Sequence, residues 1–336
     1  MGAHMSRIRI PVALLALAAL LAAGCGTSGG GGGSRRLSLV AYSTPREAYQ
    51  RLIPAFQKTS AGNGATFSQS YGASGDQSRA VANGLSADVV ALSLEPDMKK
   101  LVDAGLVDRN WNGDPYKGMV TDSVAALVVR KGNPKGIHTW ADLVKPGVQV
   151  ITPNPFSSGG ARWNVMAAYG AQIKQGKSDA EAIAYLEQLF RNVPVQDKSA
   201  REALQTFVGG KGDVMIAYEN EAIAAQQAKQ PVDYVVPDQT VLIENPVAVV
   251  TKSKNPTQAK AFVDFLRSPE GQAIFAEKGY RPVNTRATGA DKFPRPSGLF
   301  TITDLGGWDQ VTKRFFDKGS GVMADVERKV GVSLGN

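Results

Sequence analysis

The chain has few of the side chains that perform covalent or metal chemistry. Its 336 residues include one cysteine, Cys25, and two histidines, His4 and His138. A single cysteine excludes a disulfide framework, and two histidines are too few for histidine-based zinc chemistry. No Asp-x-Asp spacing suggests a carboxylate site for a metal ion. We therefore predict a protein that is not an enzyme and that carries no metal and no cofactor.

Two glycine-containing motifs lack the spacing that catalysis or nucleotide binding requires. Residues 72–76, Gly-Ala-Ser-Gly-Asp, differ from the Gly-x-Ser-x-Gly nucleophile elbow, and residues 209–213 lack the Ser or Thr that follows lysine in a phosphate loop. An extracytoplasmic serine hydrolase with Ser74 or Ser158 as nucleophile is an alternative, but its base would have to be His138, which we place in a surface turn. A structural adhesin without a ligand is another alternative.

The first residues have the pattern of a secretory leader. Arg7 and Arg9 precede an apolar run over residues 10–23, which is shorter than the roughly 20 residues that span a bilayer. We predict that residues 1–24 are a signal peptide with a cloning scar at residues 2–4. The small residues before Cys25 resemble a lipobox, so we expect Cys25 to be lipidated and to hold the protein on the outer face of the cell membrane. Cleavage nearby without lipid is the alternative.

Beyond the leader, residues 25–36 are rich in glycine and predict a flexible tether. Without Arg7 and Arg9, the 38 basic residues fall to 36 against 30 acidic ones, which slightly favours anionic partners. Arginine and lysine do not cluster with aromatic residues, so we expect no nucleic-acid partner. We expect a monomer, and the remaining chain is long enough for two packed lobes.

From residue 37 onward, short apolar strands alternate with amphipathic helices, which predicts an α/β protein with mostly parallel sheets. Residues 44–47, Thr-Pro-Arg-Glu, and residues 74–77, Ser-Gly-Asp-Gln, have the spacing of capping boxes at helix starts. Two apolar strands, residues 124–129 and 246–250, each end a long α/β block. We predict that these strands cross between the two lobes and contain the hinge.

The most informative segment is residues 154–163, Asn-Pro-Phe-Ser-Ser-Gly-Gly-Ala-Arg-Trp, between a predicted strand and a predicted helix. Helix N-termini carry about half a positive charge and up to four unpaired N–H groups, so small residues there can hold an anion without a cationic side chain. Similar turns occur at residues 43–44, 74–75 and 199–200, each predicted to follow a strand. Ligands of open α/β sheets bind at the carboxyl ends of strands. We therefore predict an anion site.

From residue 37 onward, the sequence resembles the bacterial periplasmic sulfate-binding proteins of ATP-driven sulfate importers. The matching motifs are residues 71–77, 129–135, 154–163, 212–222 and 268–272. The resemblance implies an α/β, type II, two-lobe periplasmic-binding-protein fold, with mixed sheets flanked by helices and the ligand in the interlobe cleft. It also implies delivery of sulfate to the transmembrane permease subunits of an ABC importer. We expect lobe I at residues 37–122 and 246–299, lobe II at residues 123–245, and a tail at residues 300–336 that packs back on the lobes.

The same resemblance implies which residues bind sulfate. Backbone N–H groups, hydroxyls and one aromatic side chain supply the donors: Ser43, Ser74, Ser158, Gly159, Gly160, Ala200 and Tyr218. Ser43 replaces a common aspartate, and Tyr218 stands where many relatives have tryptophan. Four charged residues are expected beside the site without touching the anion: Arg46, Asp76, Arg162 and Arg201.

Selection of sulfate follows from protonation. Sulfate carries no proton near neutral pH, whereas hydrogen phosphate does, and a pocket of donors leaves that proton unmatched at a cost of about 1–3 kcal/mol. The phenol of Tyr218 can accept as well as donate, so we expect this pocket to reject protonated oxyanions less strictly than a pocket with tryptophan. Thiosulfate, molybdate or another oxyanion is the alternative ligand.

Overall fold

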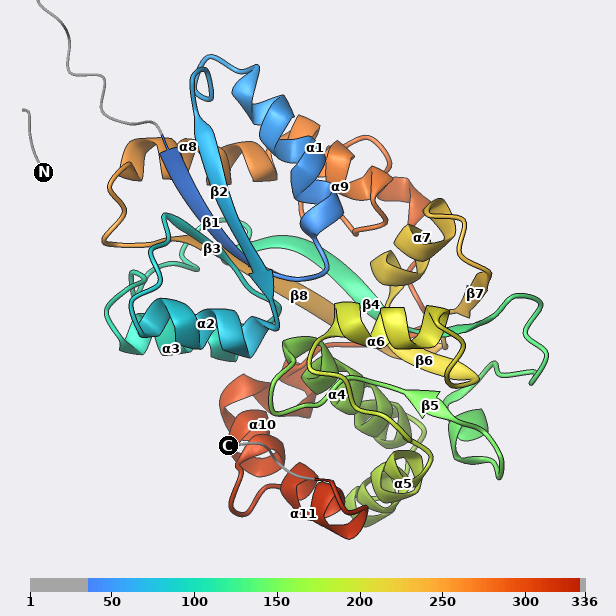
Figure 1. Ribbon diagram of the computed structural model, residues 1–336. Helices are drawn as coiled ribbons and strands as arrows, with labels where there is room; N and C mark the ends of the chain where they lie inside the picture. The colour runs from blue at the N-terminus through green and yellow to red at the C-terminus, as the bar shows by residue number, and fades with distance from the viewer. Residues whose placement is uncertain (1–35, 333–336) are drawn as a thin grey trace, which may run out of the picture. The chain divides into compact units, whose positions relative to one another are not determined.

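In residues 36–332, the part of the chain that the computed structural model describes, nine strands join into one mixed sheet (Figure 1). The strand order is β2-β1-β3-β8-β4-β6-β5, with β7 paired to β4 and β9 to β8. The strands are β1 (Arg36–Tyr42), β2 (Thr66–Gly72), β3 (Val89–Ala91), β4 (Met119–Arg130), β5 (Val150–Ile151), β6 (Val214–Tyr218), β7 (Val232–Val235), β8 (Gln239–Val249) and β9 (Gly298–Phe300).

The predicted signal peptide, Cys25 and residues 25–35 of the predicted tether lie outside the described residues. Arg36, predicted to end the tether, is instead the first residue of β1. In the described range, no helix combines the length and apolar character needed to cross a membrane.

Two long strands connect the two ends of the sheet. β4 pairs with β8 through residues 119–124 and with β6 and β7 through residues 125–130, while β8 reaches β3 through residues 247–249. We call β1, β2 and β3 with their flanking helices the first half, and β5, β6 and β7 with theirs the second half. The sequence predicted mostly parallel sheets, but β4 runs antiparallel to β6, β7 and β8, and β8 runs antiparallel to β3. The sheet is therefore mixed, as the family resemblance implied.

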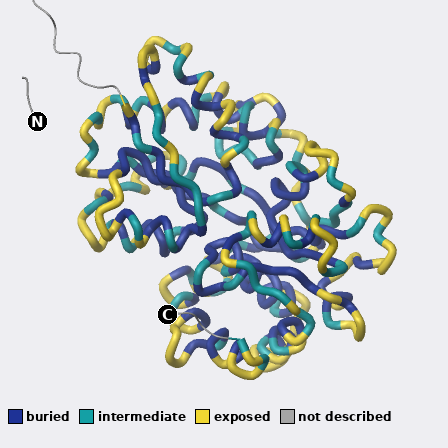
Figure 2. Tube along the Cα trace, viewed as in Figure 1, coloured by how far each residue is buried: buried dark blue, intermediate teal, exposed yellow. Residues whose placement is uncertain are grey.

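Helices cover both faces of each half. They are α1 (Arg46–Gln57), α2 (Ser74–Ala82), α3 (Glu95–Asp103), α4 (Gly159–Lys174), α5 (Asp179–Arg191), α6 (Ala200–Val208), α7 (Glu219–Gln227), α8 (Pro256–Arg267), α9 (Pro269–Glu277), α10 (Gly307–Phe316) and α11 (Val322–Lys329). The strands between these layers are largely buried (Figure 2).

The alternation of side chains along a strand explains this layering. In β1, Leu37, Leu39 and Ala41 pack with α1, α8 and α9, whereas Val40 packs with α2 and α3 on the opposite face. Strands that bury both faces need apolar residues at successive positions, which is the pattern of β1 and β3.

The second half repeats the arrangement. Val214 and Ile216 of β6 face the core of α4 and α5, and Met215 and Ala217 face α6 and α7. The C-terminal helices α10 and α11 lie beside α4 and α5 and complete that core (Figure 1). Trp308 of α10 packs edge to face against Trp163 of α4, with 4.7 Å between ring centroids.

Two predicted capping boxes are wrong. α1 has Pro45 as its N-cap without a side-chain cap, the Thr44 hydroxyl is buried without a hydrogen-bond partner, and Glu47 contacts Arg201. α2 begins at Ser74 itself, whose hydroxyl accepts a long-range hydrogen bond instead of capping the helix. Tertiary contacts therefore override the local capping pattern at both turns, between the halves at α1 and within the first half at α2.

Candidate functional site

Serine residues follow the three parallel strands of the first half. β1 is parallel to both β2 and β3, so their carboxyl ends lie at the same edge of the sheet. Ser43 follows β1, Ser74 follows β2, and Ser93 follows β3. Ser74 and Ser93 are buried, with 2% and 1% of their surface exposed, and Ser43 is half-buried. This edge therefore presents hydroxyls and the N-terminus of α2.

Three helix starts in the second half carry the other predicted residues. Ser158 is the N-cap of α4, which begins with Gly159 and Gly160. Ala200 is the first residue of α6, and Tyr218 ends β6 and is the N-cap of α7. The element directly before Ser199 is the helix α5, not a strand, so the sequence prediction of a strand there is wrong. Loop hydrogen bonds position this segment instead, because the Asn154 N–H donates to Asp197 O at 2.8 Å.

Contacts at the two glycines bring these residues together. A Cβ placed on Gly160 would lie 3.5 Å from both Ser158 Oγ and Ala200 Cβ, and 3.7 Å from Tyr218 Cε1. A Cβ placed on Gly159 would lie 2.0 Å from Leu94 Cδ2 and 2.7 Å from Ser93 Oγ. Only glycine allows the start of α4 to approach the loop after β3 so closely. The two halves therefore meet at this point.

Ser93, which the sequence prediction missed, connects the two halves. Its N–H donates to Ser74 Oγ at 3.0 Å, and its Oγ lies 2.9 Å from the Tyr218 hydroxyl. Its carbonyl oxygen accepts from Trp163 Nε1 at 2.8 Å and from Asn245 Nδ2 at 2.9 Å. The available signal was its position, because Ser93 directly follows the apolar run of residues 89–92, and the carboxyl ends of such strands form ligand sites.

Two serine hydroxyls are oriented to donate. Ser74 Oγ accepts from the Ser93 N–H, and Ser158 Oγ accepts from the Ala161 N–H at 3.3 Å. A hydroxyl that accepts from the protein keeps its own hydrogen for a ligand. No histidine or carboxylate hydrogen-bonds either hydroxyl among the described residues, so neither serine has the adjacent base that a nucleophile requires.

Six of the seven predicted binding residues are thus linked by short contacts or by shared helix starts: Ser74, Ser158, Gly159, Gly160, Ala200 and Tyr218. Ser43 is linked only through its neighbour Thr44, whose carbonyl oxygen accepts from Arg201 at 3.4 Å. The predicted binding groups are backbone N–H groups and hydroxyls from both halves, and α2, α4, α6 and α7 begin near one another, so the positive ends of these helices lie in one region.

The charged residues expected beside the site make contacts within the protein. Arg46 lies over the Tyr71 ring at 5.6 Å, and Arg162 donates to Pro155 O at 3.0 Å. Burial lowers the pKa of Arg162. Asp76 pairs with Arg79 and, at 3.2 Å, with Lys198.

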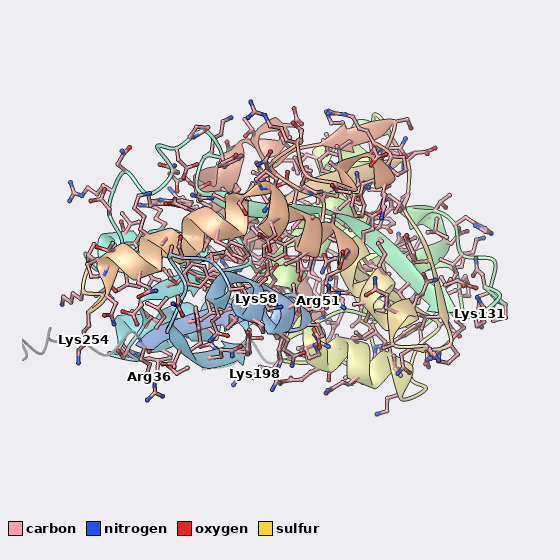
Figure 3. The ribbon with its side chains drawn as sticks, turned by 90° about the horizontal axis from the view of Figure 1, so that it is seen from above. Arg36, Arg51, Lys58, Lys131, Lys198 and Lys254 are labelled. Carbon is pink, nitrogen blue, oxygen red and sulfur yellow. The ribbon has the colours of Figure 1, made fainter. Side chains whose placement is uncertain are left out.

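Arg201 reaches from α6 to the first half, where it forms an ion pair with Glu47. Burial alone would lower the pKa of Arg201, but this hydrogen-bonded pair raises it. Lys198, which also pairs across the halves, lies well away from Lys131 and Lys254 at the two ends of the molecule (Figure 3). The labelled basic side chains in that view are spread over the surface.

A buried carboxyl that was not predicted lies beside the site. Glu221 on α7 accepts from the Tyr218 N–H at 3.4 Å, and its other oxygen has no partner. Burial raises its pKa to about 7, against the opposing charge of Arg201. It lines a small cleft with Thr44, Glu47 and Tyr280 among others. A raised pKa means that Glu221 is partly neutral at pH 7, which reduces its repulsion of an anion.

Within the described part of the chain, histidine, cysteine and carboxylate residues form no group of three or more that could hold a metal ion. The single described histidine, His138, lies in the turn before a short 3-10 helix, Trp140–Val144, where its backbone N–H donates to Asp142 at 2.9 Å.

The sheet is mixed, has helices on both faces, and is connected by two long strands, with a cluster of helix N-termini between its halves. This is the architecture of periplasmic solute-binding proteins. Residues 37–281 match the family model described as bacterial extracellular solute-binding protein. The chain belongs to this family. The α/β periplasmic-binding-protein fold implied by the sequence is therefore confirmed.

Comparison with individual relatives shows which members of this family the chain resembles. The sulfate-binding protein of Synechococcus elongatus is 43% identical over 91% of this chain and 92% of its own length. The thiosulfate-binding protein of Pseudomonas aeruginosa is 37% identical over 90% of this chain and 95% of its own. Among solved structures, the sulfate-binding protein SubI of Mycobacterium tuberculosis H37Rv has a TM-score of 0.81 at 46% identity, covering 84% of this chain and 99% of that one. The resemblance to sulfate-binding proteins is confirmed, and these relatives are named as binding proteins rather than enzymes.

Proposed function

We propose that this protein is an extracytoplasmic receptor that binds inorganic sulfate between the two halves of its sheet and delivers it to the permease of an ABC importer. One observation carries the proposal. A Cβ placed on Gly160 would lie within van der Waals distance of Ser158, Ala200 and Tyr218, so the starts of α4, α6 and α7 converge on one small region. The names of the relatives support sulfate as the anion.

The proposed ligands are backbone N–H groups and hydroxyls: Ser43, Ser74, Ser158, Gly159, Gly160, Ala200 and Tyr218. Seven charge-assisted hydrogen bonds at about 1.5–3 kcal/mol each give roughly 10–20 kcal/mol before the costs of desolvation and closure. A net free energy of binding of about −8 kcal/mol, or micromolar affinity, fits this balance.

The two halves act as lobes in this proposal. Lobe I comprises residues 37–122 and 246–299, lobe II comprises residues 123–245, and the tail from residue 300 packs back on the lobes. β4 and β8 serve as the hinge, because they pair with each other while β8 pairs with β3 of the first half and β4 with β6 and β7 of the second half. The protein works as a monomer that a lipid on Cys25 holds at the outer face of the cell membrane.

Thiosulfate is the second candidate ligand. It is supported by the thiosulfate-binding relative, which matches nearly the whole chain at 37% identity. Helix N-termini and hydroxyls bind a tetrahedral oxyanion through its oxygen atoms, so the affinity for each anion depends on its size and protonation.

Calorimetric titration of the protein with sulfate, thiosulfate, molybdate and phosphate tests the proposal. We expect sulfate to bind most tightly, and a Ser158→Ala variant to lose about 1–2 kcal/mol of binding free energy with its lost hydroxyl donor. The matched control is Ser78→Ala, since Ser78 is also buried and donates to Asp97 O at 2.6 Å, one turn along α2 from Ser74. A protein that binds none of these anions would contradict the proposed function.

A further inference from the structure

The Ser93 and Tyr218 hydroxyls form a buried pair between the halves. Their oxygens lie 2.9 Å apart, and either can be the donor. Both residues have only 1% of their surface exposed. Ser93 follows β3 in the first half, and Tyr218 ends β6 in the second half. The pair is therefore formed only when the two halves are together.

The position of Ser93 is fixed while its hydroxyl hydrogen can turn. Its backbone N–H donates to Ser74, and its carbonyl oxygen accepts from Trp163 and Asn245. These three bonds fix the main chain, whereas a serine hydroxyl can rotate about its C–O bond to donate in more than one direction. The direction of the bond to Tyr218 can thus reverse without movement of the backbone.

The Tyr218 side chain lies against the proposed anion site. Its ring carbon Cε1 is 3.7 Å from the position of a Cβ on Gly160, and Ser93 Oγ is 2.7 Å from that of a Cβ on Gly159. Burial raises the pKa of Tyr218 well above its ordinary value, and hydrogen bonds with Ser93 and Asn245 oppose this rise. The phenol is neutral at pH 7, so it has one hydrogen to donate and lone pairs to accept with.

We propose that Ser93 and Tyr218 act as a reversible hydroxyl pair that lets the anion site present either a donor or an acceptor. When Ser93 donates to Tyr218, the phenol hydrogen is free for an unprotonated dianion such as sulfate. When Tyr218 donates to Ser93, the phenol oxygen is free to accept the proton of an oxyanion such as hydrogen phosphate. The inference rests on the proposed function, because it assumes that the anion occupies the site beside Gly160.

The two arrangements predict different losses when the Ser93 hydroxyl is removed. In Ser93→Ala, Tyr218 can still donate to sulfate, so sulfate affinity falls by about threefold or less. Phosphate affinity falls by about tenfold or more, because the Tyr218 oxygen accepts the phosphate proton only while the Tyr218 hydrogen is donated to the Ser93 hydroxyl, which the variant lacks. If the role of Ser93 were purely structural, Ser93→Ala would lower the affinities for both anions by the same factor.

A double-mutant cycle with Tyr218→Phe tests the coupling. Tyr218→Phe removes the donor and the acceptor together, so both affinities should fall. In the Tyr218→Phe background, adding Ser93→Ala should no longer change the ratio of sulfate to phosphate affinity. Calorimetry at pH 7 with both anions measures each corner of the cycle, and thermal unfolding of each variant verifies that it is folded.

The outcomes separate the two claims. If the protein binds no sulfate, the proposed function is wrong. If it binds sulfate but no phosphate at any accessible concentration, the acceptor arrangement does not exist and only the hydroxyl pair is refuted. An equal effect of Ser93→Ala in both backgrounds refutes it as well. Should Ser93→Ala fail to fold, Tyr218→Trp is the second variant, since an indole only donates hydrogen bonds. It should lower the affinity for phosphate while retaining the affinity for sulfate.

Discussion

Gly160 offers a direct test of where the anion binds. A methyl group at this position would contact Ser158 Oγ and Ala200 Cβ at 3.5 Å and Tyr218 Cε1 at 3.7 Å. These are ordinary van der Waals distances, so the folded protein can accept the methyl without a clash. Alanine also favours a helix over glycine by up to about 1 kcal/mol. We therefore expect Gly160→Ala to leave thermal stability unchanged or slightly increased.

Binding should respond differently. The methyl would stand among three groups that we propose to face the anion, where it displaces the ligand or holds the halves apart. Overpacking of a filled site costs about 1–3 kcal/mol, which corresponds to a weakening of sulfate binding by roughly 5- to 150-fold. Calorimetric titration with sulfate and thermal unfolding of the same preparation measure the two effects separately.

The sulfate affinity and the thermal stability of Gly160→Ala together show whether the anion binds beside Gly160. Unchanged affinity in a stable Gly160→Ala variant would show that the anion does not bind against α4, and the proposed site would be wrong. A large loss of stability would instead refute the packing argument, because it would mean that the space around Gly160 is needed by the fold itself.

Two further substitutions should separate packing from charge. In Gly159→Ala the new Cβ would lie 2.0 Å from Leu94 Cδ2, so we expect the free energy of unfolding to fall by about 1–3 kcal/mol. The variant should therefore unfold at a lower temperature in thermal melts and bind sulfate more weakly in calorimetry. Glu327, buried in α11, receives a hydrogen bond from Gln196 at 2.7 Å, and burial raises its pKa to about 7. The folded state thus binds its proton more tightly than the unfolded state, and stability falls as pH rises from about 4.5 to 7. Glu327→Gln should stabilise the protein by up to about 3 kcal/mol at pH 8 and have little effect at pH 4, in urea unfolding at both pH values.

Local sequence patterns predicted much of the second half. Ser178 and Glu181 have the spacing of a capping box, and the box forms, with a 2.8 Å bond from the Ser178 N–H to the carboxylate. Ser158 is a helix N-cap, and α6 begins at Ala200 after its cap Ser199. Such features depend on residues within one turn of each other, so they can be read from adjacent letters of the sequence.

The features that failed depend on distant residues. Glu47 was predicted to close a capping box with Thr44, but it pairs with Arg201, more than 150 positions away. The pairing of Ser93 with Tyr218 joins residues separated by 125 positions. No local pattern marks either contact, because each exists only after the two halves are assembled around β4 and β8.

The polar contacts that cross between the halves suggest what drives them together. The ion pairs Arg201–Glu47 and Lys198–Asp76 have partly exposed side chains, with Lys198 at 68% exposure, and pairs of this kind contribute about 0–1 kcal/mol each. Other contacts are the close packing at Gly159, the hydrogen bonds of Ser93, and the buried ion pair of Arg281 with Glu219 on α7 at 2.7 Å. The cost of desolvating both charges offsets much of the attraction in a buried pair of this kind. A bound dianion would add several charge-assisted hydrogen bonds from both halves at once, each stronger than a surface ion pair. We therefore expect the ligand, rather than the ion pairs, to supply most of the free energy that keeps the halves closed.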